Sequence, residues 1–317
     1  MRSAAELRDD GVVAPERHDG LVRVRRGFYV ADSEWPSTER EARHFVRMQA
    51  VAAAISEPVF SHQSAAVLWG VPVVGQLGDV HVMAAGKVGR RTRRGVIWHN
   101  HRLEDKDLAI VDGFRVTSLE RTLFDIAASS ARVAGIAAVD AGTRASFVSG
   151  LGTRVEGVPK EELITAFAAR AGARGLRGAL ACARFADPRS GSAGESVSRW
   201  NLHRLGFPSP ELQVPFERDD GGHDVVDFDW PEHGRFGEFD GFGKYVRERY
   251  TGGRPIEEVV WDEKRREDRV RRHRPFASRW GWSEALHPAR LERRLVGDGL
   301  PKVRPSQPLS TDTDRAE

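Results

Sequence analysis

Residues 225–241 read VVDFDWPEHGRFGEFDG, and this stretch decides the fold of the last third of the chain. Two runs of apolar and acidic residues flank a turn that contains a proline and a glycine. Side chains alternate between the two faces of a β-strand, so the pattern predicts neighbouring strands at 224–230 and 236–241. One face of the first strand is apolar and contains Val226, Phe228 and Trp230. We expect the apolar face of this sheet to pack against a helix.

The acidic side chains of the two strands lie on the other face. Asp227 points there from the first strand, and Glu238 and Asp240 share a face of the second strand. The short turn makes the strands neighbours about 4.8 Å apart, so one registration brings these three carboxylates together. Acids repeated on one face of central strands rarely serve packing, which indicates a site. Asp229 stands nearest the turn, and we expect it to pair with an arginine or to face solvent.

A cluster of carboxylates is costly without a cation. Like charges at contact distance disfavour mutual ionisation. A hard divalent ion relieves this repulsion, and Mg²⁺ binds one or two carboxylates together with waters and phosphate oxygens. Such an ion activates water and stabilises the charge that builds on a phosphodiester. The acids therefore predict a Mg²⁺ site, in which Mn²⁺ could substitute.

The flanking residues extend these strands to the order helix, strand, strand, strand, helix, strand. The remaining elements are predicted at 195–205, 212–216, 257–273 and 276–280. Glu195 begins the first helix two turns before Leu202, so it faces the sheet if Leu202 packs there. The long helix carries mixed charges at helical spacing, which usually indicates a solvated, salt-bridged face. Lys264 is a candidate for the site, and Arg266 and Arg279 are candidates for contact with DNA phosphates.

The first 30 residues end in a basic, alternating stretch. Residues 21–30 place apolar side chains and arginines at period two, and Gly27 interrupts the run. This pattern predicts a β-hairpin or wing. Its basic side chains either contact DNA phosphates or keep an edge strand soluble, and the sequence leaves both roles open. The residues concerned are Arg23, Arg25 and Arg26.

The middle of the chain contains helical and strand-like segments. Helices are predicted at 39–55, 62–69, 133–144 and 160–185. Strand-like runs are predicted at 79–84, 95–99 and 109–116. Thr117 and Glu120 have the spacing of a capping box and open a further helix. The turn-rich residues 187–192 predict the start of the last domain.

Composition limits the classes of protein. With 317 residues the chain has room for two domains and a small third. Its single cysteine, Cys182, excludes an internal disulfide and fits a reducing compartment. We expect a cytoplasmic protein, since the N-terminal residues lack the apolar core of a signal peptide and no apolar run reaches the roughly 18 residues of a membrane helix. The net charge of +3, with arginine in excess of lysine, only slightly favours nucleic acid as a partner.

Five short motifs of the last third resemble a known family. They are Gly194-Glu195-Ser196, residues 226–231, residues 237–241, Lys244-Tyr245 and residues 263–268. In this order and spacing they are similar to uncharacterised proteins related to the very-short-patch repair endonuclease, within the PD-(D/E)XK, or restriction endonuclease-like, superfamily. The resemblance covers about residues 191–286. It implies an αβββαβ fold and a Mg²⁺-dependent DNA phosphodiesterase.

The resemblance also implies roles for single residues. The acids that match the family's first metal-binding aspartate, the acid of its E-x-K element and its helix glutamate are Asp227, Glu238 and Glu195. The lysine of that element orients or helps activate the attacking water, and here Asp240 stands in its place. Lys244 or Lys264 would have to supply the ammonium from elsewhere in the chain. If neither does, the domain is expected to bind DNA without cutting it.

The front half resembles a second family. Residues 21–30, residues 61–66 with Gly70-Val71-Pro72, and residues 116–118 with 120–125 are similar to AbiEi-type antitoxins of type IV toxin–antitoxin systems. These proteins join an N-terminal winged helix to a second domain and repress their own promoter by binding DNA. The resemblance covers roughly residues 20–145. Little sequence precedes the wing, so we expect a truncated winged-helix element.

The sequence thus predicts an α/β (α+β) protein that binds DNA. The expected parts are a wing-like hairpin or remnant winged helix at 1–32, an AbiEi-like α+β domain at 33–187, a PD-(D/E)XK nuclease-like domain at 188–287 and a mostly disordered tail at 288–317. Two functions stay open. One is a Mg²⁺-dependent DNA endonuclease, a hydrolase of defence or repair. The other is a non-catalytic AbiEi-like antitoxin or transcriptional regulator whose nuclease-like domain is inactive.

Overall fold

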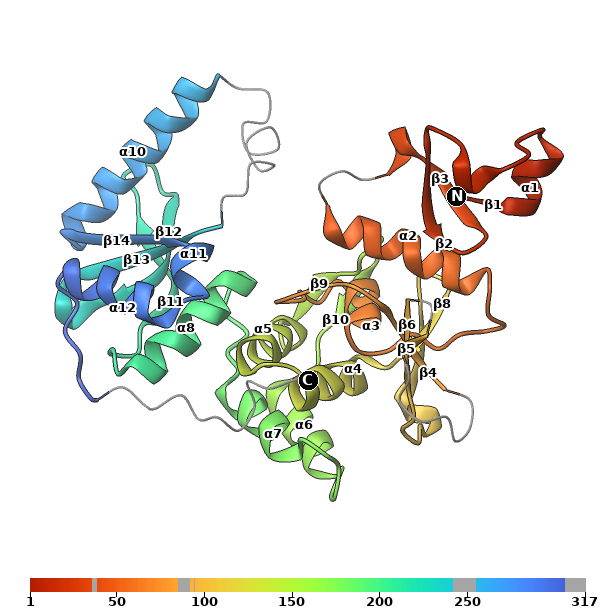
Figure 1. Cartoon of the computed structure of the whole chain (residues 1–317). Helices are drawn as coiled ribbons and strands as arrows, with labels where there is room; N and C mark the ends of the chain where they lie inside the picture. Colours follow the sequence, from red (N-terminus) through yellow and green to blue (C-terminus); the bar gives the residue numbers. More distant parts are fainter. Residues whose placement is uncertain (36–38, 85–91, 94, 242–254, 306–317) are drawn as a thin grey trace. The chain divides into compact units, whose positions relative to one another are not determined.

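A computed structural model of the chain describes residues 1–35, 39–84, 92–93, 95–241 and 255–305 (Figure 1). Helices and several small sheets make up these residues, so the expected mixed α and β class is confirmed. The chain divides into two compact units, with Met1–Ser130 and Gly142–Arg184 in unit 1 and Ala131–Ala141 and Phe185–Glu317 in unit 2. Among the described residues, no helix combines the length and apolar character that a membrane crossing needs.

Unit 1 begins with a small three-stranded sheet. Its antiparallel strands are β1 (Arg2–Ser3), β2 (Leu21–Arg25) and β3 (Phe28–Ala31), in the order β1-β3-β2. The hairpin predicted at 21–30 is therefore confirmed, and β2 lies at an edge of the sheet. Between β1 and β2 the chain forms the short helix α1 (Ala4–Asp9) and a 3₁₀ turn, η1 (Pro15–Arg17). A second 3₁₀ turn, η2 (Asp32–Glu34), follows the sheet.

The core of unit 1 joins helices to a second small sheet. The helices are α2 (Arg40–Ala52), α3 (His62–Trp69) and α4 (Leu119–Ser129), and the strands are β4 (Val80–Met83), β5 (Thr92–Arg93) and β6 (Val96–His99). The sheet order is β4-β6-β5, with β4 parallel to β6. Phe60 is buried in the core cluster that also contains Met48, Leu68 and Val82. Its backbone bridges Val82 of β4 and Val116 of β8 (Phe114–Thr117), which ties the two strand systems together.

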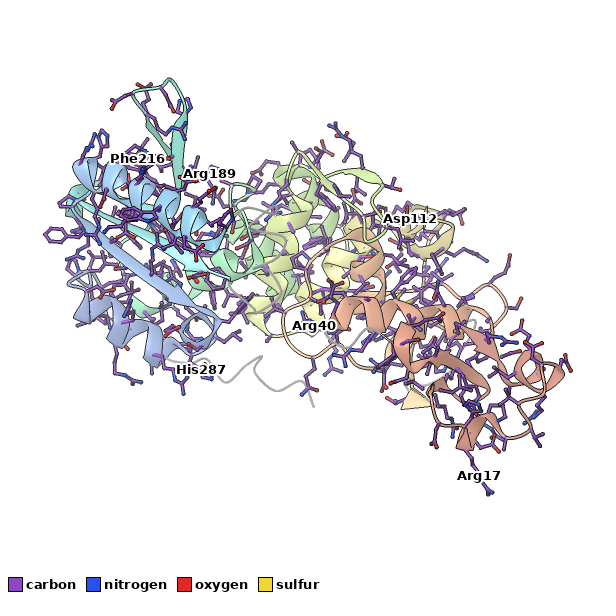
Figure 2. The ribbon with its side chains drawn as sticks, turned by 90° about the horizontal axis from the view of Figure 1, so that it is seen from above. Arg17, Arg40, Asp112, Arg189, Phe216 and His287 are labelled. Atoms are coloured by element: carbon purple, nitrogen blue, oxygen red, sulfur yellow. The ribbon has the colours of Figure 1, made fainter. Side chains whose placement is uncertain are left out.

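Two predictions in unit 1 are wrong because of a turn and a cap. The single strand expected at 109–116 is a hairpin of β7 (Leu108–Val111) and β8 (Phe114–Thr117), which follows the 3₁₀ turn η3 (Asp105–Asp107). Asp112 and Gly113 have positive φ values of 49° and 83°, as a tight two-residue hairpin turn requires. Asp112, labelled in Figure 2, accepts hydrogen bonds from Ser149 and Thr153. The cap of α4 is Ser118, whose side chain accepts from the Arg121 N–H.

The helix expected at 160–185 is also divided. After α4 the chain forms α5 (Arg132–Gly142), β9 (Ser146–Val148), β10 (Arg154–Glu156), α6 (Lys160–Ala168) and α7 (Leu176–Phe185). Gly172 and Gly175 lie between α6 and α7 with φ values of 80° and 79°, which are left-handed and end a helix. Cys182 is fully buried in α7, as expected for a small core residue.

Unit 2 contains the element order predicted from its sequence. The elements are α8 (Ala193–Leu205), β11 (Glu211–Glu217), β12 (His223–Trp230), the 3₁₀ turn η4 (Pro231–His233), β13 (Arg235–Asp240), α10 (Ile256–His273) and β14 (Phe276–Gly281). Their four strands form one sheet in the order β11-β12-β13-β14. The first three strands are antiparallel neighbours, and β14 runs parallel to β13.

Helices pack against both faces of this sheet. On the α8 face, the Trp280 ring packs against Phe228 and its Nε1 donates to Ser198 Oγ at 2.8 Å. On the α10 face, Val270 packs with Phe216, Val226 and Phe236. The prediction that Val226 shares a face with Phe228 and Trp230 is therefore wrong.

The C-terminal residues form more structure than their composition indicated. Two further helices follow β14, α11 (Trp282–Ala285) and α12 (Pro288–Gly297). Leu291 and Leu295 of α12 are fully buried. The expectation of a disordered tail is therefore wrong for 288–297, because these two leucines lie one turn apart and form an apolar stripe that packs on the unit. Residues 306–317 lie outside the described residues.

Candidate active site

The predicted acid cluster is built around an irregular step between β11 and β12. The pairing passes from Leu212↔Phe228 to Val214↔Val226 and omits Gln213 and Asp227. Gln213 has a φ of 53°, in the left-handed region that few non-glycine residues adopt. The register is the same on both sides of this step, so neither strand gains a residue. Across the step, Val226 packs towards α10 and Phe228 packs towards α8.

Gln213 joins two of the predicted acids. Its Nε2 donates to Glu195 Oε2 at 2.9 Å and to Asp227 Oδ1 at 3.1 Å. Glu195 lies in the first turn of α8 and also accepts from the Gly191 N–H at 2.7 Å. Asp227 Oδ2 accepts from the Phe239 N–H at 2.8 Å. Two buried or partly buried carboxylates thus share one amide donor.

Burial and the neighbouring charges of Glu195 and Glu238 together raise the pKa of the Asp227 carboxyl to about 6, against the hydrogen bonds from Phe239 and Gln213, which lower it. The carboxylates at this point therefore carry more negative charge than the nearby hydrogen-bond donors offset. A bound cation would favour the ionised form of Asp227.

Glu238 is neutralised by two arginines that we had expected to contact DNA. Arg266 Nη2 lies 2.6 Å from Glu238 Oε1, and Arg279 Nη2 lies 2.8 Å from Glu238 Oε2. Both arginines also contact Glu263 of α10, at 3.1 and 2.6 Å. The parallel register pairs Glu238 with Arg279 on adjacent strands, and α10 brings Arg266 over the same face. Both guanidinium groups are therefore engaged within the unit.

The other residues of the prediction differ in exposure and in partners. Asp240 is exposed at the end of β13. Lys264 is exposed on α10, and its Nζ lies 5.4 Å from the centroid of the Trp261 ring. Lys244 lies outside the described residues. Asp229 is buried in a two-bond ion pair with Arg274, at 2.7 and 2.9 Å, so the expected pairing is observed and exposure to solvent is not.

The four acids predicted to bind a metal ion do not form a compact ligand set. They are Glu195, Asp227, Glu238 and Asp240. Within the described parts of the chain, one group of three or more His, Cys, Asp or Glu residues has all its ligand atoms within 4.8 Å of one another, and it consists of histidines of unit 1. The acids instead form two neighbouring parts, the pair bridged by Gln213 and the Glu238–arginine group. Sequence reasoning missed Gln213, and its only signal was a lone polar residue between Leu212 and Val214.

The basic residues of the N-terminal hairpin differ in exposure. Arg23 and Arg26 are exposed, whereas Arg25 is partly buried. Two exposed guanidinium groups on an edge hairpin are compatible with both roles that the sequence left open, contact with phosphates and protection of a sheet edge.

Comparisons with known proteins identify relatives. No protein-family model matches the chain, and no solved structure matches it significantly. Two curated sequences of Mycobacterium tuberculosis do match, the Uncharacterized protein Rv2248 of strain H37Rv and the Uncharacterized protein MT2308 of strain CDC 1551. Each is 30% identical over 216 residues, which cover 68% of this chain and 72% of the relative. At this identity and coverage, the chain belongs to the same family as these mycobacterial proteins.

Proposed function

We propose that unit 2 is a nuclease-like domain of the PD-(D/E)XK type, which binds DNA and hydrolyses phosphodiester bonds with Mg²⁺. The order α8, β11, β12, β13, α10, β14 agrees with the αβββαβ order that the resemblance implies. The observation that carries the proposal is the bridge from Glu195 through Gln213 to Asp227, at a point where Asp227 has a raised pKa. An excess of buried carboxylate is a suitable donor set for a hard divalent cation.

The roles of the chain's own residues follow from their contacts. Glu195 and Asp227 would hold the ion. The side-chain amide of Gln213 would either rotate to present its oxygen to the ion or move out of the space between the two carboxylates. When bound, the ion would activate water and offset charge on the phosphodiester. Glu238, with its Arg266 and Arg279 partners, would present a charge-balanced surface on which a phosphate can compete for the guanidinium groups.

Cleavage of supercoiled plasmid in Mg²⁺ or Mn²⁺ tests this proposal. Asp227→Asn removes a charge at the centre of the acid pair, and we expect it to abolish nicking by the purified full chain. Glu232→Gln is the matched control, because Glu232 is exposed in η4 beside the same strands, and we expect it to leave nicking unchanged. Full activity in Asp227→Asn would overturn the assignment.

A second candidate function is favoured by the position of Asp240. The lysine of the E-x-K element of the PD-(D/E)XK superfamily is replaced by this exposed acid. Lys264 lies against Trp261 instead of the acids. We infer as the alternative an AbiEi-like DNA-binding regulator that does not cleave. It predicts salt-dependent binding to the DNA upstream of its own gene. Absence of a band shift at moderate salt would exclude it.

The N-terminal hairpin offers a specific variant for this alternative. Arg23→Ala with Arg26→Ala removes two exposed charges, and we expect the slope of log affinity against log salt to fall by about 2. Arg154→Ala is the control, because Arg154 is also exposed in unit 1 but lies on β10. An unchanged slope in the double variant would show that the hairpin does not contact DNA.

A further inference from the structure

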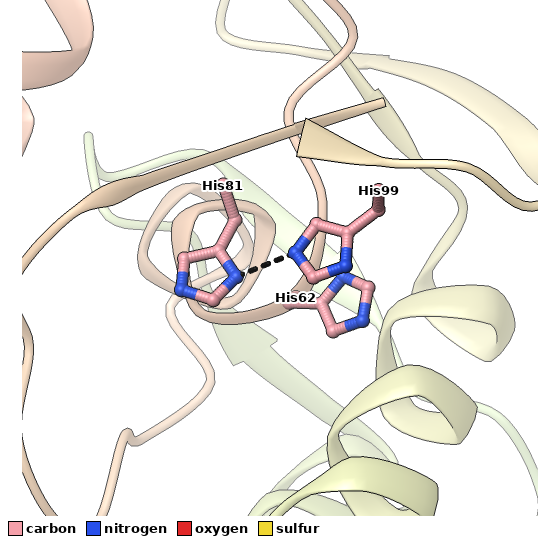
Figure 3. A group of neighbouring side chains, drawn as sticks. All are labelled: His62, His81 and His99. Atoms are coloured by element: carbon pink, nitrogen blue, oxygen red, sulfur yellow. Dashed lines mark hydrogen bonds between the residues drawn. The ribbon is translucent and has the colours of Figure 1, made fainter. Parts of the chain in front are cut away.

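Three histidines of unit 1 meet at one point (Figure 3). His62 is the first residue of α3, His81 lies in β4 and His99 ends β6. His81 Nδ1 lies 2.8 Å from His99 Nε2, and the His62 and His99 rings are stacked with centroids 3.6 Å apart. One ligand atom from each ring lies within 4.8 Å of the other two. His62 and His99 are buried, with 5% and 6% exposure.

The backbone holds these rings in place. The Ser61 N–H donates to the His81 carbonyl at 3.1 Å, and the His81 N–H donates to Ser64 Oγ at 2.8 Å. The start of α3 is therefore fixed to β4 on both sides of His81. His62 has a φ of 48°, a left-handed conformation that is unusual outside glycine and persists only where the surroundings enforce it. The fold thus maintains strain to aim the His62 ring into the group.

We propose that His62, His81 and His99 form a binding site for a divalent transition-metal ion, with Zn²⁺ as the preferred ion. Three imidazole nitrogens suit Zn²⁺, which takes four tetrahedral ligands at about 2.0–2.1 Å from nitrogen. That geometry separates ligand nitrogens by about 3.3 Å. The His81 and His99 nitrogens would move apart slightly, and the His62 ring would rotate out of its stack.

A buried carboxylate supports the site from behind. Among the described residues, Asp125 Oδ2 has no hydrogen-bond partner. It lies 3.9 Å from His62 Nδ1, while Oδ1 accepts from Arg121 Nε at 2.9 Å. Metal-bound histidines usually donate their second N–H to a carboxylate, which fixes the tautomer. Ser61 Oγ lies 3.1 Å from the same His62 nitrogen and offers an alternative partner. Asp125 is therefore placed to hold His62 with its other nitrogen towards the ion.

The ion would join α3 to β4 and β6, so its expected effect is to stabilise unit 1. This site shares no residue with the acids of unit 2 and stands independently of the nuclease proposal.

The test measures metal content of the full chain, purified without a histidine tag. Asp227→Asn is included in the background, so that the acids of unit 2 do not contribute. After chelation, incubation with Zn²⁺ and gel filtration, we expect about one tightly held Zn²⁺ per chain. Co²⁺ should give the visible absorption of a four-coordinate ion. His81→Ala and His99→Ala should each lose both signals, whereas His18→Ala, an exposed control in unit 1, should keep them.

The opposite outcome is equally defined. A protein that retains no Zn²⁺ and gives no Co²⁺ band holds a hydrogen-bonded histidine cluster in its core, and the proposal is then overturned. The Asp227→Asn protein, which keeps all three histidines, answers this question by itself. The test therefore remains valid even if a histidine variant fails to fold. Zn²⁺ retained equally by His81→Ala and His99→Ala would place the ion elsewhere and also reject the site. Thermal unfolding adds a second readout, because a ligand that binds only the folded state raises the melting temperature.

Discussion

Asp227 is joined to Glu195 by one irregular residue on the neighbouring strand. Gln213 leaves the ladder at a φ of 53° and places its amide between Asp227 and Glu195. A regular strand would instead present this side chain on one face of the sheet, in step with Glu211. The irregularity therefore creates the contact that concentrates two carboxylates at one point.

At this scale, Gln213→Ala tests the bridge. The variant removes a donor shared by two carboxylates that are largely buried, and hydrogen bonds to charged groups contribute about 1.5–3 kcal/mol each. We expect unit 2 to lose about 2 kcal/mol in free energy of unfolding, and Mg²⁺ to restore part of that loss. Gln76→Ala, at an exposed position in unit 1, serves as control. A loss no larger than the control's would show that the bridge contributes nothing.

A second residue-scale prediction concerns pH. The hydrogen bond from Arg269 holds the pKa of Asp224 below its usual 3.8, and Arg218 and Arg266 act in the same direction. A depressed folded-state pKa contributes stability that is present above the unfolded value and is lost as the pH falls through the folded value. Between pH 5 and about pH 2, Asp224→Asn should therefore lose less stability than the wild type. Parallel stability–pH curves for the two proteins would contradict this assignment.

At the scale of elements, alternation was sufficient to predict β12 and β13 to within one residue. Predicted at 224–230 and 236–241, they are observed at His223–Trp230 and Arg235–Asp240. The face of Val226 could not be predicted, since period two assumes regular pairing throughout. The meeting of Glu195 with Asp227 was predicted, but the arginine partners of Glu238 were not, because they depend on the register of β14 and on helix α10, both distant in sequence.

The division of α6 from α7 gives an element-scale prediction with an internal control. A Cβ added at Gly175 would lie 2.2 Å from the Ala128 carbonyl oxygen, whereas one at Gly172 would meet nothing within 4 Å. Both glycines have positive φ, so alanine costs about 1–2 kcal/mol at either position. Gly175→Ala should cost clearly more than Gly172→Ala in chemical denaturation, because the turn must also move away from α4. Equal losses in free energy of unfolding for the two variants would show that the turn at Gly175 moves away from α4 at no energetic cost.

At the scale of the whole molecule, the chain enters unit 2 twice. Residues 131–141, which include most of α5, belong to unit 2. Residues 142–184 return to unit 1, and the chain then completes unit 2 from Phe185 onward. Asp140 and Arg199 join the two stretches of unit 2. Both Asp140 oxygens lie 2.9 Å from Arg199 Nη2, and Asp140 is fully buried. A buried ion pair thus connects segments on either side of the excursion into unit 1.

Arg199→Ala is therefore expected to destabilise unit 2 strongly. It removes the charged partner of a buried carboxylate, which keeps the hydrogen bond from the Asp187 N–H. Breaking a buried ion pair in this way typically costs about 3–5 kcal/mol. Arg189→Ala is the matched control, because Arg189 pairs with Asp187 near the same junction but its side chain is 62% exposed, so its loss should cost about 1 kcal/mol or less. Thermal unfolding of the full chain should show a lowered melting temperature in Arg199→Ala, whereas Arg189→Ala should melt close to the wild type. If the two variants unfold alike, α5 is held to unit 2 by its apolar contacts and the ion pair is dispensable.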